Sequence, residues 1–279
     1  MTEAVKLVTF LNTVFVVLLI ASGSLGGYLG DIVYYLAFII PIAIGFYSSG
    51  RLRIKREEIK GVAEEPETIL RFDRSRLLKL LPLIAPAVLV VFLASLLSSL
   101  LLSLLGVASA PVEDTGIVRM LLVHALVPAF FEEALFRYIT MKLLMPYSKR
   151  WCILYSALCF ALIHCSFVQM PYAFIAGLIF MLIDVALGSV WPSVILHLVN
   201  NTASVVWMKY CSGVGASVVF VLVLALLALI SILFVFRSKR EYSKMLYGAF
   251  DKGESCCVSY APAVLIVICS YVAALSAFS

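Results

Sequence analysis

The chain has 279 residues, of which 63% are hydrophobic and only 13% are charged. Uninterrupted apolar runs of about 18 residues or more recur along it, and a run of that length spans the hydrocarbon core of a bilayer. This composition excludes an ordinary soluble enzyme. Anionic lipid headgroups are a sufficient partner for the net charge of +5, so no nucleic acid is expected to bind. We predict an all-α, polytopic protein of the lipid bilayer.

The apolar runs predict a transmembrane helical bundle of about eight or nine spans. In chain order they cover 7–23, 32–49, 80–106, 117–141, 151–168, 171–188, 191–209, 214–236 and 257–277. Eighteen of the 21 basic residues fall in segments that lie on one side if the spans alternate. The positive-inside bias therefore predicts a cytoplasmic N-terminus and an external C-terminus. We expect the plasma membrane in a prokaryote, or the endoplasmic reticulum in a eukaryote.

Ionisable side chains inside the predicted spans are the first candidates for function. Such a group near the bilayer centre costs about 2.5–3.5 kcal/mol even on insertion scales, so it needs a partner or a task. The candidates are Glu132, Glu133, Asp184, Arg119, Arg137, His124, His164 and His197. Two interpretations of Asp184 stay open, a hydrogen bond to a neighbouring helix and a place in the cavity wall.

The stretch FFEEALFR, residues 130–137, places two glutamates and an arginine in an apolar helix. Glu133 and Arg137 are four residues apart, so they share a helical face and can pair. Glu132 is rotated by about 100° and is left to face a cavity. Pro128, one turn earlier, removes a backbone hydrogen bond, and we expect it to kink the helix and widen the pocket.

Two later spans carry polar groups at helical spacing. Phe160 and His164 are four residues apart, and so are His197 and Asn201, which can point two hydrogen-bond donors into the same space. If these groups converge with Glu132, they form a polar pocket inside the membrane. A carboxylate and an imidazole can hold and deprotonate water there, and donors can stabilise a tetrahedral oxyanion.

Three short motifs give the chain a family resemblance. EEALFR fits Glu-Glu-x3-Arg, FALIH fits Phe-x3-His and HLVNN fits His-x3-Asn, in that order. The chain resembles the CPBP family of type II CAAX prenyl endopeptidases and bacteriocin-processing membrane proteases. The resemblance implies an intramembrane endopeptidase with a membrane-associated or prenylated protein or peptide substrate. The resemblance covers residues 117–207, the expected catalytic core. The apolar runs and the charge bias place N-terminal spans at 1–116, with a cytoplasmic loop at 50–79, before this core and C-terminal spans at 208–279 after it.

The resemblance assigns a role to each motif residue. Glu132 and His164 match the residues that activate the attacking water. His197 and Asn201 match the residues that stabilise the oxyanion. These four residues are the predicted catalytic set.

Glu133 and Arg137 match supporting residues of the family, in agreement with their spacing. The two-histidine zinc motif H-E-x-x-H is absent, so we expect no metal cofactor. The alternative is a zinc ion held by Glu132, His164 and His197, because one carboxylate and two histidines can form a catalytic zinc site.

Two other classes of protein could use the same pocket. In a membrane transporter the glutamates and histidines would relay protons or bind an ion. A non-catalytic protein would instead bind a membrane partner. The polar groups cluster in the fourth to seventh spans, without the inverted repeats typical of transporters, and this favours the protease.

Overall fold

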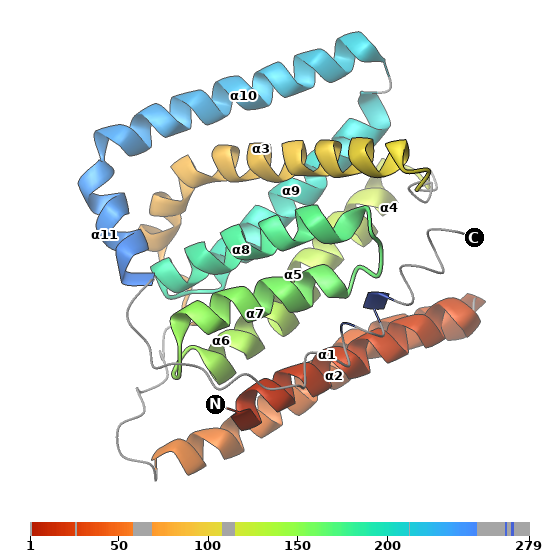
Figure 1. Cartoon of the computed structure of the whole chain (residues 1–279), viewed down its shortest axis with the longest axis vertical. Helices are drawn as coiled ribbons and strands as arrows, with labels where there is room; N and C mark the ends of the chain where they lie inside the picture. The colour runs from red at the N-terminus through yellow and green to blue at the C-terminus, as the bar shows by residue number, and fades with distance from the viewer. Residues whose placement is uncertain are drawn as a thin grey trace.

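The computed structural model describes residues 2–25, 27–57, 69–107, 115–211 and 213–249, with 266, 269 and 270, and these residues form no strand. The helices, shown in Figure 1, are α1 (Thr2–Leu25), α2 (Gly27–Glu57), α3 (Arg74–Leu104), α4 (Ile117–Leu121), η1 (Leu122–Leu126), α5 (Val127–Glu133), η2 (Ala134–Ile139), α6 (Thr140–Leu144), α7 (Lys149–Leu162), α8 (Gln169–Leu187), α9 (Trp191–Tyr210), α10 (Val214–Arg237) and α11 (Lys239–Ala249). The predicted all-α class is confirmed for this part of the chain. The ninth predicted span, 257–277, lies almost wholly outside the described residues.

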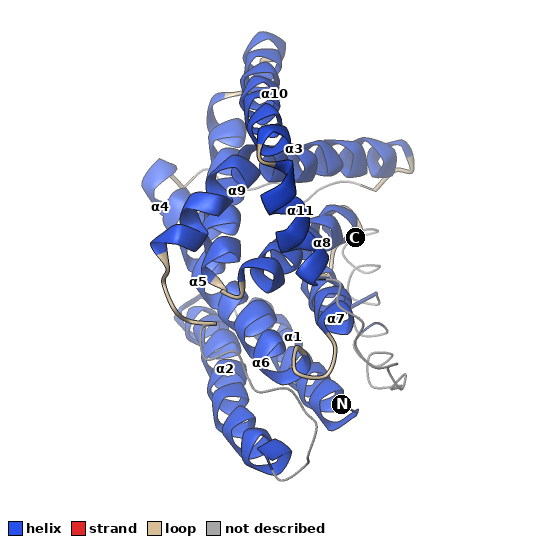
Figure 2. Ribbon diagram, turned by 90° about the vertical axis from the view of Figure 1, so that its left-hand side faces the viewer, coloured by secondary structure: helices blue, strands red, loops and turns tan. Residues whose placement is uncertain are grey.

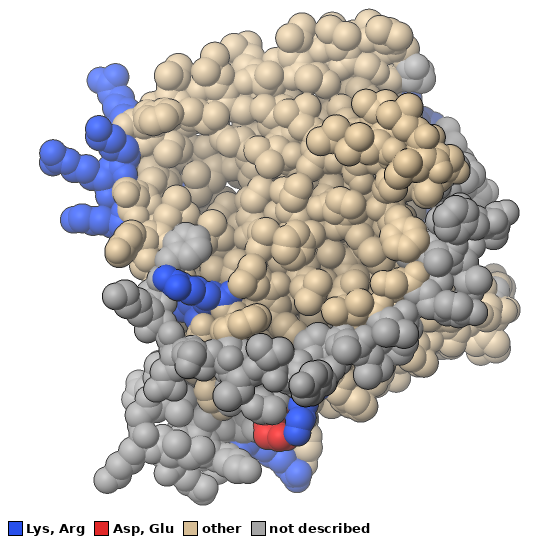
Figure 3. Space-filling model, in the orientation of Figure 1, with Lys and Arg blue, Asp and Glu red and all other residues tan. Residues whose placement is uncertain are grey.

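Five of the described helices, α1, α2, α3, α8 and α10, are long and apolar enough to cross a membrane. Lys and Arg side chains gather at the left edge of Figure 3, over α11 and the adjoining end of α10, while the described surface beside them is almost free of charge. The exposed basic residues of these two helices are Arg237, Lys239, Arg240 and Lys244. This pattern is that of an integral membrane protein with a basic end at the headgroups.

The helices from α4 to α9 lie between two flanking pairs (Figures 1 and 2). α1 and α2 pack against each other on one side, and α3 packs against α10 on the other. One buried hydrophobic cluster joins the N-terminal pair to α7 and α8, and it includes Phe15, Phe38, Phe136 and Phe180. The flanking helices therefore cover part of the segment in which the polar residues lie.

Residues 117–144 form one continuous helical rod from α4 to α6 in place of the span predicted at 117–141. Two short π-helical stretches, η1 and η2, interrupt its α-helical hydrogen bonding on either side of α5. Glu132 and Glu133 are the last two residues of α5. The glutamates thus occupy a single α-helical segment between two wider turns, and such π turns are frequent at functional sites.

α7 ends at Leu162, so the predicted span 151–168 is wrong in its last part. Backbone bonds from His164 N–H to Ala161 and from Cys165 N–H to Leu162 tighten the final turn. Cys165 then adopts a left-handed conformation with a φ of 46°. His164 consequently lies in the turn that follows α7 and not on the helix itself.

α3 supports this turn from outside the central helices. Its first residues are capped by Asp73, whose side chain accepts the Ser75 N–H at 2.8 Å, and this hydrogen bond lowers the pKa of the Asp73 carboxyl. Further along α3, the Ser98 hydroxyl donates to the Val168 carbonyl at 2.7 Å. The end of the turn that contains His164 is therefore fixed to α3.

α7 and α8 approach each other closely at Gly177. A Cβ atom at this position would lie 2.8 Å from the Cα of Ala157. Glycine is needed here because any side chain would push the two helices apart.

We expect Gly177→Val to lower the free energy of unfolding by about 1–3 kcal/mol, because overpacking forces the backbones of α7 and α8 to shift. Gly215→Val is the matched control, since a Cβ atom at Gly215 meets no atom within 4 Å. The measurement is unfolding of the purified variants in detergent. Equal stability of the two variants would contradict the close approach.

Candidate functional site

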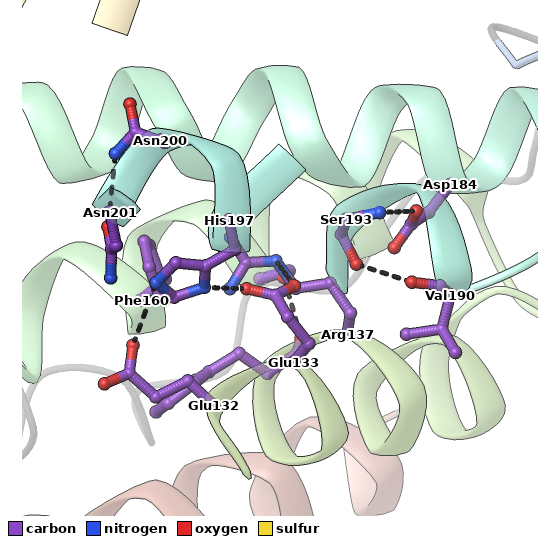
Figure 4. A network of polar contacts seen from close by, with 12 residues as sticks. Glu132, Glu133, Arg137, Phe160, Asp184, Val190, Ser193, His197, Asn200 and Asn201 are labelled. Carbon is purple, nitrogen blue, oxygen red and sulfur yellow. Dashed lines mark hydrogen bonds and ion pairs between the residues drawn. The ribbon is translucent and has the colours of Figure 1, made fainter. Parts of the chain in front are cut away.

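The carboxylate of Glu133 is the centre of a buried polar cluster (Figure 4). Its Oε2 lies 3.1 Å from Nε of Arg137, and both side chains are completely buried. Its Oε1 lies 2.6 Å from Nδ1 of His197 on α9. The pairing expected from the spacing of Glu133 and Arg137 is therefore present, and His197 joins it from another helix.

Two aromatic rings enclose the guanidinium of Arg137. Its Cζ lies 3.9 Å from the ring centroid of Phe160 on α7 and 5.8 Å from that of Phe180 on α8. Negative ring faces attract the cation, and the attraction is stronger where water is excluded. Arg137 thus connects the helix of the glutamates to α7 and α8.

Glu132 occupies a different environment from its neighbour. Its side chain is 15% exposed, and its Oε2 lies 3.9 Å from Nε2 of His197. Tyr34 of α2 and Tyr172 of α8 interact electrostatically with this carboxylate, which sequence spacing did not indicate. Separations beyond about 3.5 Å between polar atoms are often bridged by water, so Glu132 is the glutamate placed to hold one.

The partners of the two histidines fix how their rings can act. Nδ1 of His197 faces a carboxylate and therefore donates its hydrogen, leaving Nε2 directed at Glu132. Nδ1 of His164 donates to the Phe160 carbonyl at 2.7 Å, so Nε2 of a neutral ring is left as an acceptor. His164 and Glu132 both belong to the part of the chain that the structure describes, and no hydrogen bond or ion pair joins them.

The ring of Phe160 contacts both imidazoles. Its ring centroid is 5.1 Å from that of His164 and 5.7 Å from that of His197, with edge-to-face geometry in both pairs. The phenylalanine of the second motif thus contacts both histidines, and its ring also contacts Arg137. The three motifs converge in space, and His164 joins the cluster through both the ring and the backbone carbonyl of Phe160.

The amide of Asn201 is engaged away from His197. Its Nδ2 donates to the backbone carbonyl of His124 in η1 at 2.9 Å. The amide of Asn200 donates to Oδ1 of Asn201 at 3.2 Å. One amide hydrogen of Asn201 and the Nδ1 hydrogen of His197 thus already have partners, while the second amide hydrogen and Nε2 of His197 remain for a shared ligand.

Asp184 caps the start of α9. Its Oδ1 accepts the backbone N–H of Ser193 at 2.9 Å, and both side chains are buried. Of the two interpretations of Asp184, the structure shows the hydrogen bond to a neighbouring helix. Ser193 gave no signal in the sequence, and its hydroxyl donates to the Val190 carbonyl at 2.8 Å.

The residues of the alternative zinc set are not grouped as ligands. Among the described residues, no three His, Cys, Asp or Glu side chains are placed to hold a metal ion together. In agreement with this, no hydrogen bond or ion pair joins His164 to the Glu132 carboxylate.

A groove of about 650 Å³ lies beside the first turns of the same rod. It is lined by Tyr35, Arg119, Leu122, Val123 and Val127, among others. None of the motif residues lines it, so it is separate from the polar cluster.

We expect Arg137→Gln to lower the free energy of unfolding by about 3–5 kcal/mol, because it leaves Glu133 as an uncompensated buried charge. Lys6→Gln is the control, because Lys6 and Glu3 form an ion pair with side chains that are 56% and 71% exposed. Such exposed pairs contribute at most about 1 kcal/mol. Unfolding in detergent measures both, and a smaller loss from Arg137→Gln would argue against the buried pair.

Comparison with known proteins agrees with the motifs. Residues 114–203 match the family described as Type II CAAX prenyl endopeptidase Rce1-like. No curated protein and no solved structure matches the chain. The matched segment contains all the motif residues and supports, at the level of the family, a protease of the CAAX prenyl endopeptidase type. It supports the assignment of this chain to the CPBP family.

Proposed function

We propose that the chain is an intramembrane endopeptidase that hydrolyses a peptide bond in a membrane-associated or prenylated protein or peptide. The observation that supports this most is the contact of His197 with Glu133, because it places the imidazole beside Glu132. The Glu132 carboxylate and the His197 ring, 3.9 Å apart, can together contact a water molecule and the carbonyl group that it attacks. Residues 117–207 would carry the chemistry.

Glu132 is the base in this proposal. It takes a proton from water, and the resulting hydroxide adds to the carbonyl carbon of the scissile bond. His164 has its Nε2 available as an acceptor, and no hydrogen bond or ion pair joins it to Glu132, so we place the water between the two residues. When the C–N bond breaks, Glu132 returns the proton to the leaving amine.

His197 is the donor that we assign to the oxyanion. Glu133 accepts the Nδ1 hydrogen and so fixes the ring, with Nε2 directed to the space beside Glu132 in which the oxyanion would form. Pre-oriented donors of this kind are worth most where water is excluded. Asn201, the second donor implied by the resemblance, has one amide hydrogen left for this purpose.

Glu133 and Arg137 support the site without touching the substrate. Their ion pair holds the carboxylate at the correct position for His197. The proposed mechanism needs no metal ion, because Glu132 and His164 activate the water. We place the protein as a multi-pass chain that takes its substrate from the bilayer or its surface.

Glu132→Gln is expected to lower kcat for cleavage by about 10²- to 10⁴-fold, because the amide cannot accept the proton from water. The assay uses protein reconstituted in lipid vesicles with prenylated and unprenylated membrane-anchored peptides. Glu241→Gln is the matched control, since Glu241 pairs with Lys79 at the surface of α11. Its activity should equal that of the wild type.

Cleavage at the same rate by Glu132→Gln and by the wild type would reject the proposed base. The same assay with a chelator tests the cofactor. Unchanged cleavage after chelation is the expected result, and a loss that added zinc restores would replace the metal-free mechanism with a metal-dependent one.

A further inference from the structure

Pro128 interrupts the hydrogen bonding of the helix that carries the glutamates. It follows His124 by four residues and has no N–H to donate to the His124 carbonyl, as an ordinary helical residue would. Just before it, the N–H of Val127 donates to the carbonyl of Leu122, five residues back, at the end of η1. The His124 carbonyl is therefore without its usual α-helical donor.

Asn201 of α9 supplies a donor to this carbonyl, with Nδ2 at 2.9 Å from the oxygen. The orientation of the amide follows from both of its contacts, because Oδ1 accepts from Asn200 while Nδ2 faces the carbonyl. At membrane depth, a backbone group freed by proline is tolerated when a neighbouring helix satisfies it. The contact of Asn201 with His124 meets this requirement.

The same two helices meet again at the polar cluster. One turn before Asn201 on α9, His197 bonds Glu133, which follows His124 on the rod. The order of these contacts shows that α9 runs antiparallel to the rod. Two contacts at different heights fix both the position and the rotation of α9, and with them the distance from His197 to Glu132.

We propose that Asn201 is a positioning residue: its amide replaces the hydrogen bond that Pro128 removes, and this holds His197 beside Glu132. Only the effect on reaction rate rests on the proposed peptidase function. The replacement of the hydrogen bond can be tested without any substrate.

The experiment compares wild type, Asn201→Ala, Pro128→Ala and the double variant, all as full-length protein in detergent and in lipid vesicles. Asn201→Ala lowers the midpoint of thermal unfolding in the wild-type background. It has little effect in the Pro128→Ala background, because that substitution restores an N–H four residues after His124. Residue 128 thus determines whether Asn201 is needed.

Cleavage of the membrane-anchored peptide gives the second readout. Asn201→Ala lowers kcat by about 10- to 100-fold with little change in KM, since a misplacement of about 1 Å can cost about 10² in rate. The double variant recovers most of this loss. An oxyanion donor would not be rescued, because Pro128→Ala supplies no hydrogen bond to the substrate.

Ser204→Ala is the control on α9. The Ser204 hydroxyl donates to the Asn200 carbonyl within its own helix at 3.1 Å. Its effect on unfolding should therefore be the same with proline or alanine at position 128.

Three other results would contradict either the proposal or the peptidase function. An equal loss of stability from Asn201→Ala in both backgrounds overturns the replaced hydrogen bond. Rescued stability with an unrescued kcat overturns the positioning role and assigns Asn201 to the oxyanion. Rescued stability without cleavage by any of the four proteins supports the hydrogen bond and rejects the peptidase function.

Discussion

The charge on Glu133 determines how the central helices can pack. A carboxylate buried in a membrane protein is tolerated only with close partners, and the two oxygens of Glu133 are directed to two different ones. One contacts Arg137 on the same rod, and the other contacts His197 on α9. Arg137 extends the constraint to α7 and α8 through two aromatic rings. Three helices are thereby held in place around a single side chain.

α9 is held to its neighbours at three successive turns. Asp184 caps it through Ser193, Glu133 bonds His197, and Asn201 bonds the His124 carbonyl. Each contact uses a different chemical group, namely a backbone N–H, an imidazole and an amide. Both residues of the third motif therefore belong to a helix whose position is set by polar contacts, in a lipid environment where apolar packing alone does not drive helices together.

Helical spacing predicted much of this arrangement but not the partners of each group. The spans, the pairing of Glu133 with Arg137 and the separate orientation of Glu132 follow from apolar runs and from the 3.6-residue period. The end of α7 and the π turns depend on local backbone bonds that leave no periodic signal. The partner of Asn201 is a backbone carbonyl, which has no residue type to recognise. Pro128 was the available sign that such a carbonyl would be free.

The hydrogen bond from Ser98 to the Val168 carbonyl indicates which parts of the amino-acid sequence can change while the fold is kept. Ser98 lies in α3, outside the segment 114–203 that matches the family, yet it holds the end of the turn that contains His164. A backbone carbonyl accepts a hydrogen from any suitably placed donor, so this support requires a helix at that location but not a particular side chain. The architecture can therefore extend well beyond the part of the sequence in which relatedness remains visible.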